Sequence, residues 1–122
     1  MINEITYAVR GAAFKVHRVL GPGLLESAYE ACLHHELLRS GLHTQRQVGL
    51  PIIYHEVKLD VGYRLDLLVE HQVIVEIKAV KVTTPVHTAQ LLTYLRLANK
   101  PIGLLINFHT RNLQQGIQRF AL

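Results

Sequence analysis

The chain has 122 residues, with 13 lysine and arginine side chains against 9 aspartate and glutamate side chains, giving a formal net charge of +4. This length suits one domain, residues 1–122, with a proper hydrophobic core. The sequence has neither an apolar run of about 18 residues nor a cationic leader, which argues against a membrane span and a signal peptide. The single Cys32 excludes an internal disulfide and fits a cytoplasmic protein.

Two helices are predicted in the first third of the chain. Apolar residues recur at helical spacing from Ile5 to Leu20, and Gly21-Pro22-Gly23 should end that segment. A second helix is predicted from about Leu24 to Arg39. Residues three and four apart share a helix face, so this helix presents one stripe, made of Glu26, Tyr29, Leu33 and Leu37. Glu26 would then line a cleft in the first turn, although an acid there also simply favours the helix dipole.

Three strands are predicted next, over about Thr44–Tyr54, residues 63–69 (YRLDLLV) and residues 73–80 (VIVEIKAV). Residues 70–72 read as a short hairpin loop. A three-residue loop pairs Val69 with Val73, and the same register places Asp66 opposite Glu76. Opposed residues share a face of the sheet, whereas a slip of one residue would separate the two carboxylates.

Charged side chains are unusual in strands this apolar, because burying them is costly unless they are paired or hold a metal. Lys78 follows Glu76 by two residues and so points to the same face. Two close carboxylates repel, which a divalent cation between them would relieve, and oxygen ligands suit Mg²⁺ or Mn²⁺. The alternative is a cross-strand network in which Lys78 only neutralises one acid on a half-exposed face.

A third helix and two more strands complete the predicted fold. Thr83-Thr84-Pro85 is a good helix start, and the helix should run from about Pro85 to Ala98, with Gln90 and Tyr94 stacked on one face. A buried strand is predicted in IGLLINF and another near Ile117–Phe120. The strand–helix–strand unit requires parallel pairing, whereas the earlier strands can pair antiparallel. The predicted class is therefore α/β (α+β), with helices packed on a central mixed sheet.

The segment GPGLLESAY resembles the signature of the GxxExxY protein family, with Gly23, Glu26 and Tyr29 in the named positions. The similarity continues through YRLDLLV, VIVEIKAV, PVHTAQLLTYL, GLLINF and GIQR, and so covers nearly the whole chain. That family is placed in the PD-(D/E)XK nuclease superfamily, whose restriction-endonuclease-like core runs helix, three strands, helix, strand. The resemblance implies six active-site residues, which are Asp66, Glu76, Lys78, Glu26, Gln90 and Tyr94.

A nuclease of this kind would hydrolyse phosphodiester bonds with the help of Mg²⁺ or Mn²⁺. The cation would be held by Asp66, Glu76, the Ile77 carbonyl and Glu26, and would activate a water. Lys78 would orient that water or stabilise developing negative charge. The helix residues Gln90 and Tyr94 would steady the lysine or contact the phosphate backbone.

The positive net charge suits nucleic acid as the partner, with DNA favoured over RNA and with salt-sensitive contacts. A homodimer is one way for so small a domain to enclose a substrate. The eight histidines show no zinc-site spacing. One alternative function is a nuclease-fold binding module for nucleic acid or protein with weak or no activity. Another is a purely structural or oligomer-forming domain, which explains the core but not the four charged positions together.

Overall fold

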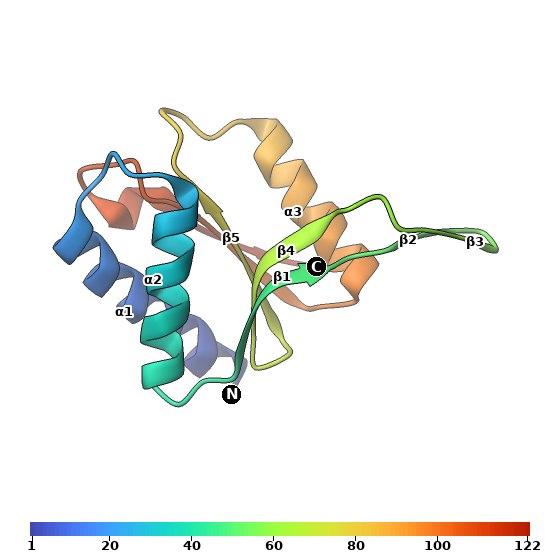
Figure 1. The fold of residues 1–122 in the computed structure, drawn as a ribbon, viewed down its shortest axis with the longest axis horizontal. Helices are drawn as coiled ribbons and strands as arrows, with labels where there is room; N and C mark the ends of the chain where they lie inside the picture. The colour runs from blue at the N-terminus through green and yellow to red at the C-terminus, as the bar shows by residue number, and fades with distance from the viewer.

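The computed structural model describes residues 1–122 as a central β-sheet with helices on both faces (Figure 1). The elements in chain order are α1 (Ile2–Leu20), α2 (Glu26–Arg39), β1 (Thr44–Gly49), β2 (Ile52–Tyr54), β3 (Val57–Leu59), β4 (Arg64–Val69), β5 (Val73–Lys78), α3 (Pro85–Ala98), β6 (Ile102–Asn107), the 3₁₀ helix η1 (Leu113–Gly116) and β7 (Ile117–Ala121). None of the helices combines the length and the apolar character needed to cross a membrane.

The main sheet has the strand order β1-β4-β5-β6-β7. Its neighbours pair antiparallel except β5 and β6, which pair parallel and are joined through α3. One core lies between the sheet and helices α1 and α2, and a smaller core lies under α3. The predicted fold class, a mixed sheet covered by helices, is confirmed.

Helix α2 is fixed at its N-terminal end by one aromatic side chain. Tyr29, Leu33 and Leu37 are completely buried, as the predicted stripe requires. The Tyr29 hydroxyl donates to the Gly21 carbonyl at 2.6 Å and accepts from the Leu24 N–H at 3.1 Å. Its ring stacks on Phe108 with 4.5 Å between centroids. The turn between α1 and α2 is therefore tied to the core, and this tie sets where α2 begins.

The predicted strand over Thr44–Tyr54 is wrong in its extent. Strand β1 ends at Gly49, and the chain then enters a separate two-stranded ribbon, β2–β3, which the sequence pattern did not predict. Pro51 has no N–H to donate to a ladder, and the Leu50 N–H bonds to the Tyr63 carbonyl at 2.8 Å. The bond between Leu50 and Tyr63 extends the β1–β4 register by one residue, and regular pairing then ends at Pro51. The second helix also begins at Glu26 rather than Leu24.

A close contact between Gly103 on β6 and Leu91 on α3 sets the distance of that helix from the sheet. A Cβ atom on Gly103 would lie 2.9 Å from Leu91 Cδ1 and 3.1 Å from Leu91 Cγ. Leu91 is fully buried, so its side chain has no free space into which it can turn. Helix α3 can therefore approach this closely only because residue 103 has no side chain.

We predict that Gly103→Ala destabilises the protein by about 1–3 kcal/mol, because it overpacks the α3 core. Gly11→Ala is the matched control, since Gly11 lies in the exposed middle of α1 and a Cβ atom added there would have no neighbour within 4 Å. It should stabilise by about 0.5–1 kcal/mol, because alanine loses less entropy in a helix. Urea unfolding of the two variants measures both effects. Equal stability of the two variants would refute this account of α3 packing.

Candidate functional site at the open end of the β4–β5 hairpin

Two carboxylates replace backbone pairing where strands β4 and β5 separate. The ladder runs from Val69 opposite Val73 to Leu67 opposite Val75, as the predicted loop and register require. At the next position the Asp66 N–H donates to Glu76 Oε2 at 2.9 Å. The Ile77 N–H in turn donates to Asp66 Oδ2 at 2.8 Å. The two side chains therefore lie together at the open end of the hairpin, opposite its loop.

Both carboxylates are in an environment that disfavours their negative charge. Glu76 is 5% exposed, and burial followed by the charge of Asp66 raises its pKa to about 8. Burial also raises the pKa of Asp66, and the bond from the Ile77 N–H partly offsets that rise. The only ion pairs of the chain are Arg39–Glu36 and Arg46–Glu30. No cationic side chain is thus paired directly with either carboxylate.

Lys78 lies half-buried at the end of β5 and acts on the pair through its charge. That charge lowers the pKa of both Asp66 and Glu76, but less than burial raises it. The ammonium forms no ion pair with either acid. Lys78 is therefore not a direct ion-pair partner of Asp66 or Glu76.

Helix α2 directs two glutamates, one turn apart, toward this end of the sheet. Glu26 is exposed, and its Oε2 accepts from the Ala79 N–H at 3.1 Å, just after β5. Glu30 is 6% exposed and its charge raises the pKa of Asp66 and Glu76. The sequence analysis identified Glu26 but missed Glu30, although a spacing of four residues on one helix was a usable signal.

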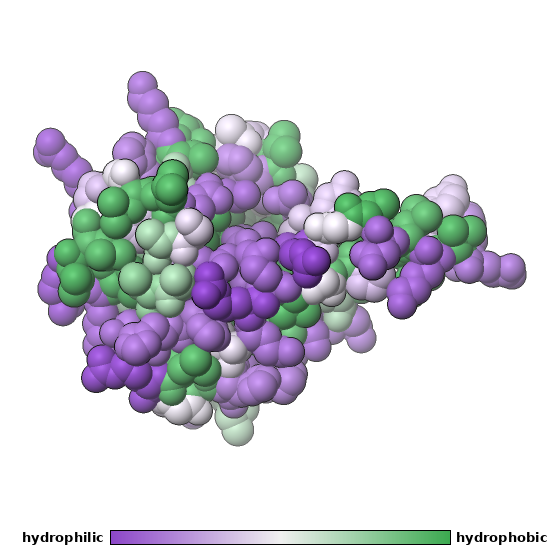
Figure 2. All heavy atoms as spheres, viewed as in Figure 1, coloured by the Kyte–Doolittle hydropathy of each residue, from purple (hydrophilic) through white to green (hydrophobic).

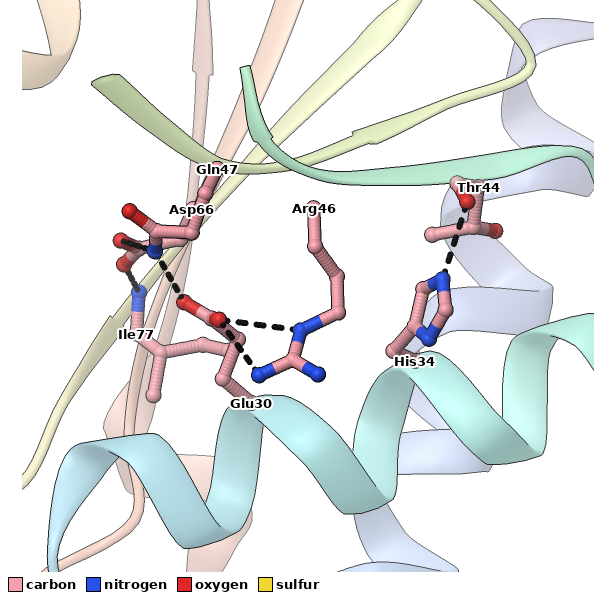
Figure 3. Close-up of polar contacts among 7 residues, drawn as sticks. All are labelled: Glu30, His34, Thr44, Arg46, Gln47, Asp66 and Ile77. Atoms are coloured by element: carbon pink, nitrogen blue, oxygen red, sulfur yellow. Dashed lines mark hydrogen bonds and ion pairs between the residues drawn. The ribbon is translucent and has the colours of Figure 1, made fainter.

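Glu30 binds two side chains of strand β1, as Figure 3 shows. Glu30 Oε2 accepts from Arg46 Nε at 3.1 Å and from Arg46 Nη2 at 3.0 Å. Glu30 Oε1 accepts from Gln47 Nε2 at 2.7 Å, and the same amide lies 3.4 Å from Asp66 Oδ1. A chain of polar contacts therefore runs from the buried glutamate of α2 to the carboxylate of β4.

Gln47 takes a left-handed backbone conformation, with φ of 51°. Such a conformation is uncommon for a residue with a side chain and occurs often at functional sites. The β1–β4 ladder pairs Arg46 with Leu67 and Val48 with Leu65, and it is interrupted between them at Gln47. The strained residue is thus the one that lies across from Asp66. The sequence of β1 is mostly polar and exposed, and it holds no pattern from which the left-handed conformation of Gln47 could be predicted.

Helix α3 brings Tyr94 to the site, whereas the Gln90 side chain forms no hydrogen bond there. Tyr94 is 6% exposed, and burial followed by the charge of Glu76 raises its pKa. Its ring packs edge-to-face on Tyr63 with 6.3 Å between centroids. Gln90 is half-buried one turn earlier and forms no side-chain hydrogen bond. The predicted residues therefore converge with the exception of Gln90.

The family model described as the PD-(D/E)XK nuclease superfamily matches residues 3–120 of the chain. The chain belongs to the PD-(D/E)XK nuclease superfamily. No curated protein and no solved structure matches it. The mixed sheet and its covering helices agree with the restriction-endonuclease-like fold of this superfamily.

Nucleases of the PD-(D/E)XK superfamily generally use divalent metal ions, so the fit of the donor atoms matters. In this chain no group of three or more His, Cys, Asp or Glu side chains is arranged to hold a metal ion. Asp66 and Glu76 each use one oxygen on a backbone N–H, and Glu26 is bonded to Ala79. Glu76 Oε1 accepts no hydrogen bond, and Asp66 Oδ1 has only the long contact to Gln47. Glu76 Oε1 and the weakly held Asp66 Oδ1, in a site that disfavours negative charge, fit a hard divalent cation.

The raised pKa of Glu76 predicts a pH-dependent stability in metal-free buffer. Its pKa is about 8 in the folded protein against the usual 4.5, so between these values the folded state holds a proton that the unfolded chain releases. The unfolding free energy should therefore fall by a few kcal/mol as pH rises through this range, and then level off. Urea unfolding at a series of pH values with a chelator measures this slope.

Glu76→Gln is the matched variant, because it keeps an acceptor for the Asp66 N–H without a titrating group. Its stability should change less with pH, and above pH 8 it should be more stable than the wild type. Identical slopes in the two proteins would show that Glu76 does not carry the effect.

Proposed function

We propose that this protein is a metal-dependent nuclease of the GxxExxY branch, formed as one domain over residues 1–122, which hydrolyses phosphodiester bonds of nucleic acid. The observation that carries this proposal is the pair of buried carboxylates, Asp66 and Glu76, with no directly paired cation. A buried acidic pair of this kind destabilises the fold unless something else is gained. Binding a catalytic cation in a nuclease fold is that gain.

Asp66 and Glu76 would hold Mg²⁺ or Mn²⁺ through their free oxygens, with the Ile77 carbonyl and Glu26 as additional ligands. When bound, such a cation lowers the pKa of a water and offsets charge on the scissile phosphate. The backbone bonds from Asp66 and Ile77 fix both carboxylates before any ligand arrives. Carboxylate ligands that are held in place in this way need no rearrangement during the reaction.

Lys78 and Tyr94 are the groups suited to act on the phosphate and the attacking water. Lys78 is half-buried at the end of β5, and its charge already reaches both carboxylates. The ammonium would stabilise negative charge as it develops. Tyr94 has a raised pKa, so its hydroxyl keeps its proton at neutral pH and can donate to a phosphate oxygen. Gln90, on the same helix, would contact the backbone of the substrate.

The surface around the site suits a polyanionic substrate, and we favour DNA over RNA. Figure 2 shows hydrophilic side chains gathered between helix α2 and the ribbon β2–β3. Arg46, Arg64 and Lys81 are exposed near the two strands that carry the acids. Contacts from such groups to phosphates give binding that weakens with salt and depends little on sequence.

A second candidate function is a nuclease-fold binding module for nucleic acid or protein, with weak or no activity. Two observations favour it, namely that no three-ligand metal cluster is formed and that the Gln90 side chain forms no hydrogen bond with the site. In this interpretation Asp66 and Glu76 serve only to cap the ends of their strands. The two functions differ in whether Lys78 has a chemical step to support.

We predict that Lys78→Ala lowers phosphodiester cleavage by about 10²–10³-fold, because it removes one preorganised charge. Binding of Mn²⁺, followed as a thermal shift, should persist, because the carboxylates remain. The measurement is digestion of labelled DNA and RNA, single- and double-stranded, with Mg²⁺ and with Mn²⁺.

Lys81→Ala is the matched control, since it removes an exposed lysine three residues further along the chain. It should keep full cleavage and lose only some affinity for nucleic acid. Equal cleavage by the Lys78 and Lys81 variants would contradict the role given to Lys78. Absence of cleavage by a folded, metal-loaded wild type would favour the binding module.

A further inference from the structure

The ribbon β2–β3 projects from the body of the molecule and belongs to no larger sheet (Figure 1). It pairs Ile52 with Leu59, Ile53 with Lys58 and Tyr54 with Val57. No further strand pairs with either of its outer edges. Two-stranded hairpins on their own are at best marginally stable in water, and unpaired edges invite association. A segment of this kind calls for a partner.

One face of the ribbon is wholly apolar. Side chains alternate along a strand and cross-strand partners share a face, so one face carries Ile52, Tyr54, Val57 and Leu59. Of these, Tyr54 is 65% exposed, Val57 54% and Leu59 42%. The opposite face carries Ile53 and Lys58. Figure 2 shows hydrophobic atoms along the projecting ribbon, uncovered by the rest of the chain.

We propose that this apolar face is a dimerisation surface, covered by the same face of a second copy of the chain. The face carries no charge, so two copies can approach without repulsion. A two-fold axis between antiparallel ribbons places the tip of one arm over the base of the other. The tip carries Glu56, whereas Arg64 and Lys100 lie at the base, where β4 starts and α3 has ended. Asp60 also lies at the base, after Leu59, so Glu56 meets a base with two cations against one acid at each end of the contact.

A groove at the base of the arm offers room for the tip of the second arm. It has a volume of about 280 Å³. Most of its lining is apolar and comes from the ends of β1, β4 and α3, including Val48, Leu50, Leu65 and Leu97, together with Ile53 of the ribbon and Lys100.

The charge of the arm selects a protein partner over nucleic acid. Between Ile52 and Asp60 the arm carries two acids, Glu56 and Asp60, against the single Lys58. A net negative ribbon does not favour a phosphate backbone. The face has four side chains, fewer than the roughly 20–30 residues per partner of a standard interface, so the dimer should form reversibly with concentration.

The test is sedimentation equilibrium of the full chain over a wide concentration range, without nucleic acid. The wild type should shift from monomer to dimer. Tyr54→Glu should weaken the dimer by at least about tenfold, because it removes the aromatic contact of the face and introduces a charge. Val19→Glu is the matched control, since Val19 is an apolar residue 82% exposed on α1, and it should leave the dimer unchanged.

Two charge variants test the tip-over-base arrangement separately. Glu56→Lys and Lys100→Glu should each weaken the dimer, and the double variant should recover most of the loss, because the opposite charges are restored. A wild type that stays monomeric at the highest concentration would overturn the proposal. So would a dimer that is equally sensitive to Val19→Glu and Tyr54→Glu. A purely monomeric protein whose DNA affinity falls with Tyr54→Glu would instead assign the arm to nucleic acid.

Discussion

The mutual capping of strands β4 and β5 by Asp66 and Glu76 is the constraint on which the site depends. Each carboxylate accepts an N–H that the interrupted ladder would otherwise leave without a partner. An unsatisfied buried N–H costs about 1–3 kcal/mol, which gives both acids a structural role beside the chemical role that we propose for them. The same capping brings two carboxyl groups together in a buried place, where burial, followed by the charge of Asp66, raises the pKa of Glu76. The capping hydrogen bonds therefore stabilise this point of the sheet, whereas the burial of two neighbouring acids destabilises it.

Helices on both faces of the sheet and strand β1 hold the side chains that surround Asp66 and Glu76. The bonds of Tyr29 to the turn before α2, and its stacking on Phe108, fix the first turn of that helix, so Glu26 reaches the end of β5. One turn later, Glu30 holds the strained Gln47 against Asp66. From the other face, the absence of a side chain at residue 103 lets α3 lie close enough to bring Tyr94 near the acids. Besides β4 and β5, the site therefore depends on α2, β1 and α3.

The elements with strong periodicity could be predicted from the sequence. The stripe of α2, the Thr84-Pro85 start of α3 and the three-residue loop after Val69 each depend on local chemistry, and each is found. The contacts of Glu30 with strand β1 could not be predicted, because they join residues 16 and 17 positions apart on different elements. The ribbon β2–β3 was missed for a related reason. Its residues are as strand-like as those of β1, and only Pro51 separates the two, because the bond of Leu50 to Tyr63 still follows the β1–β4 register.

The central claim is that the capped carboxylate pair is a cation site that carries a proton when metal is absent. Calorimetric titration with Mg²⁺ in buffers of different ionisation enthalpy tests this claim most directly, because ligands must lose their protons to bind a metal. With the pKa of Glu76 at about 8, binding at neutral pH should release close to one proton per ion. The release should fall well above pH 8 and should disappear in Glu76→Gln. Binding without proton release at neutral pH, or no binding at any pH, would contradict the account.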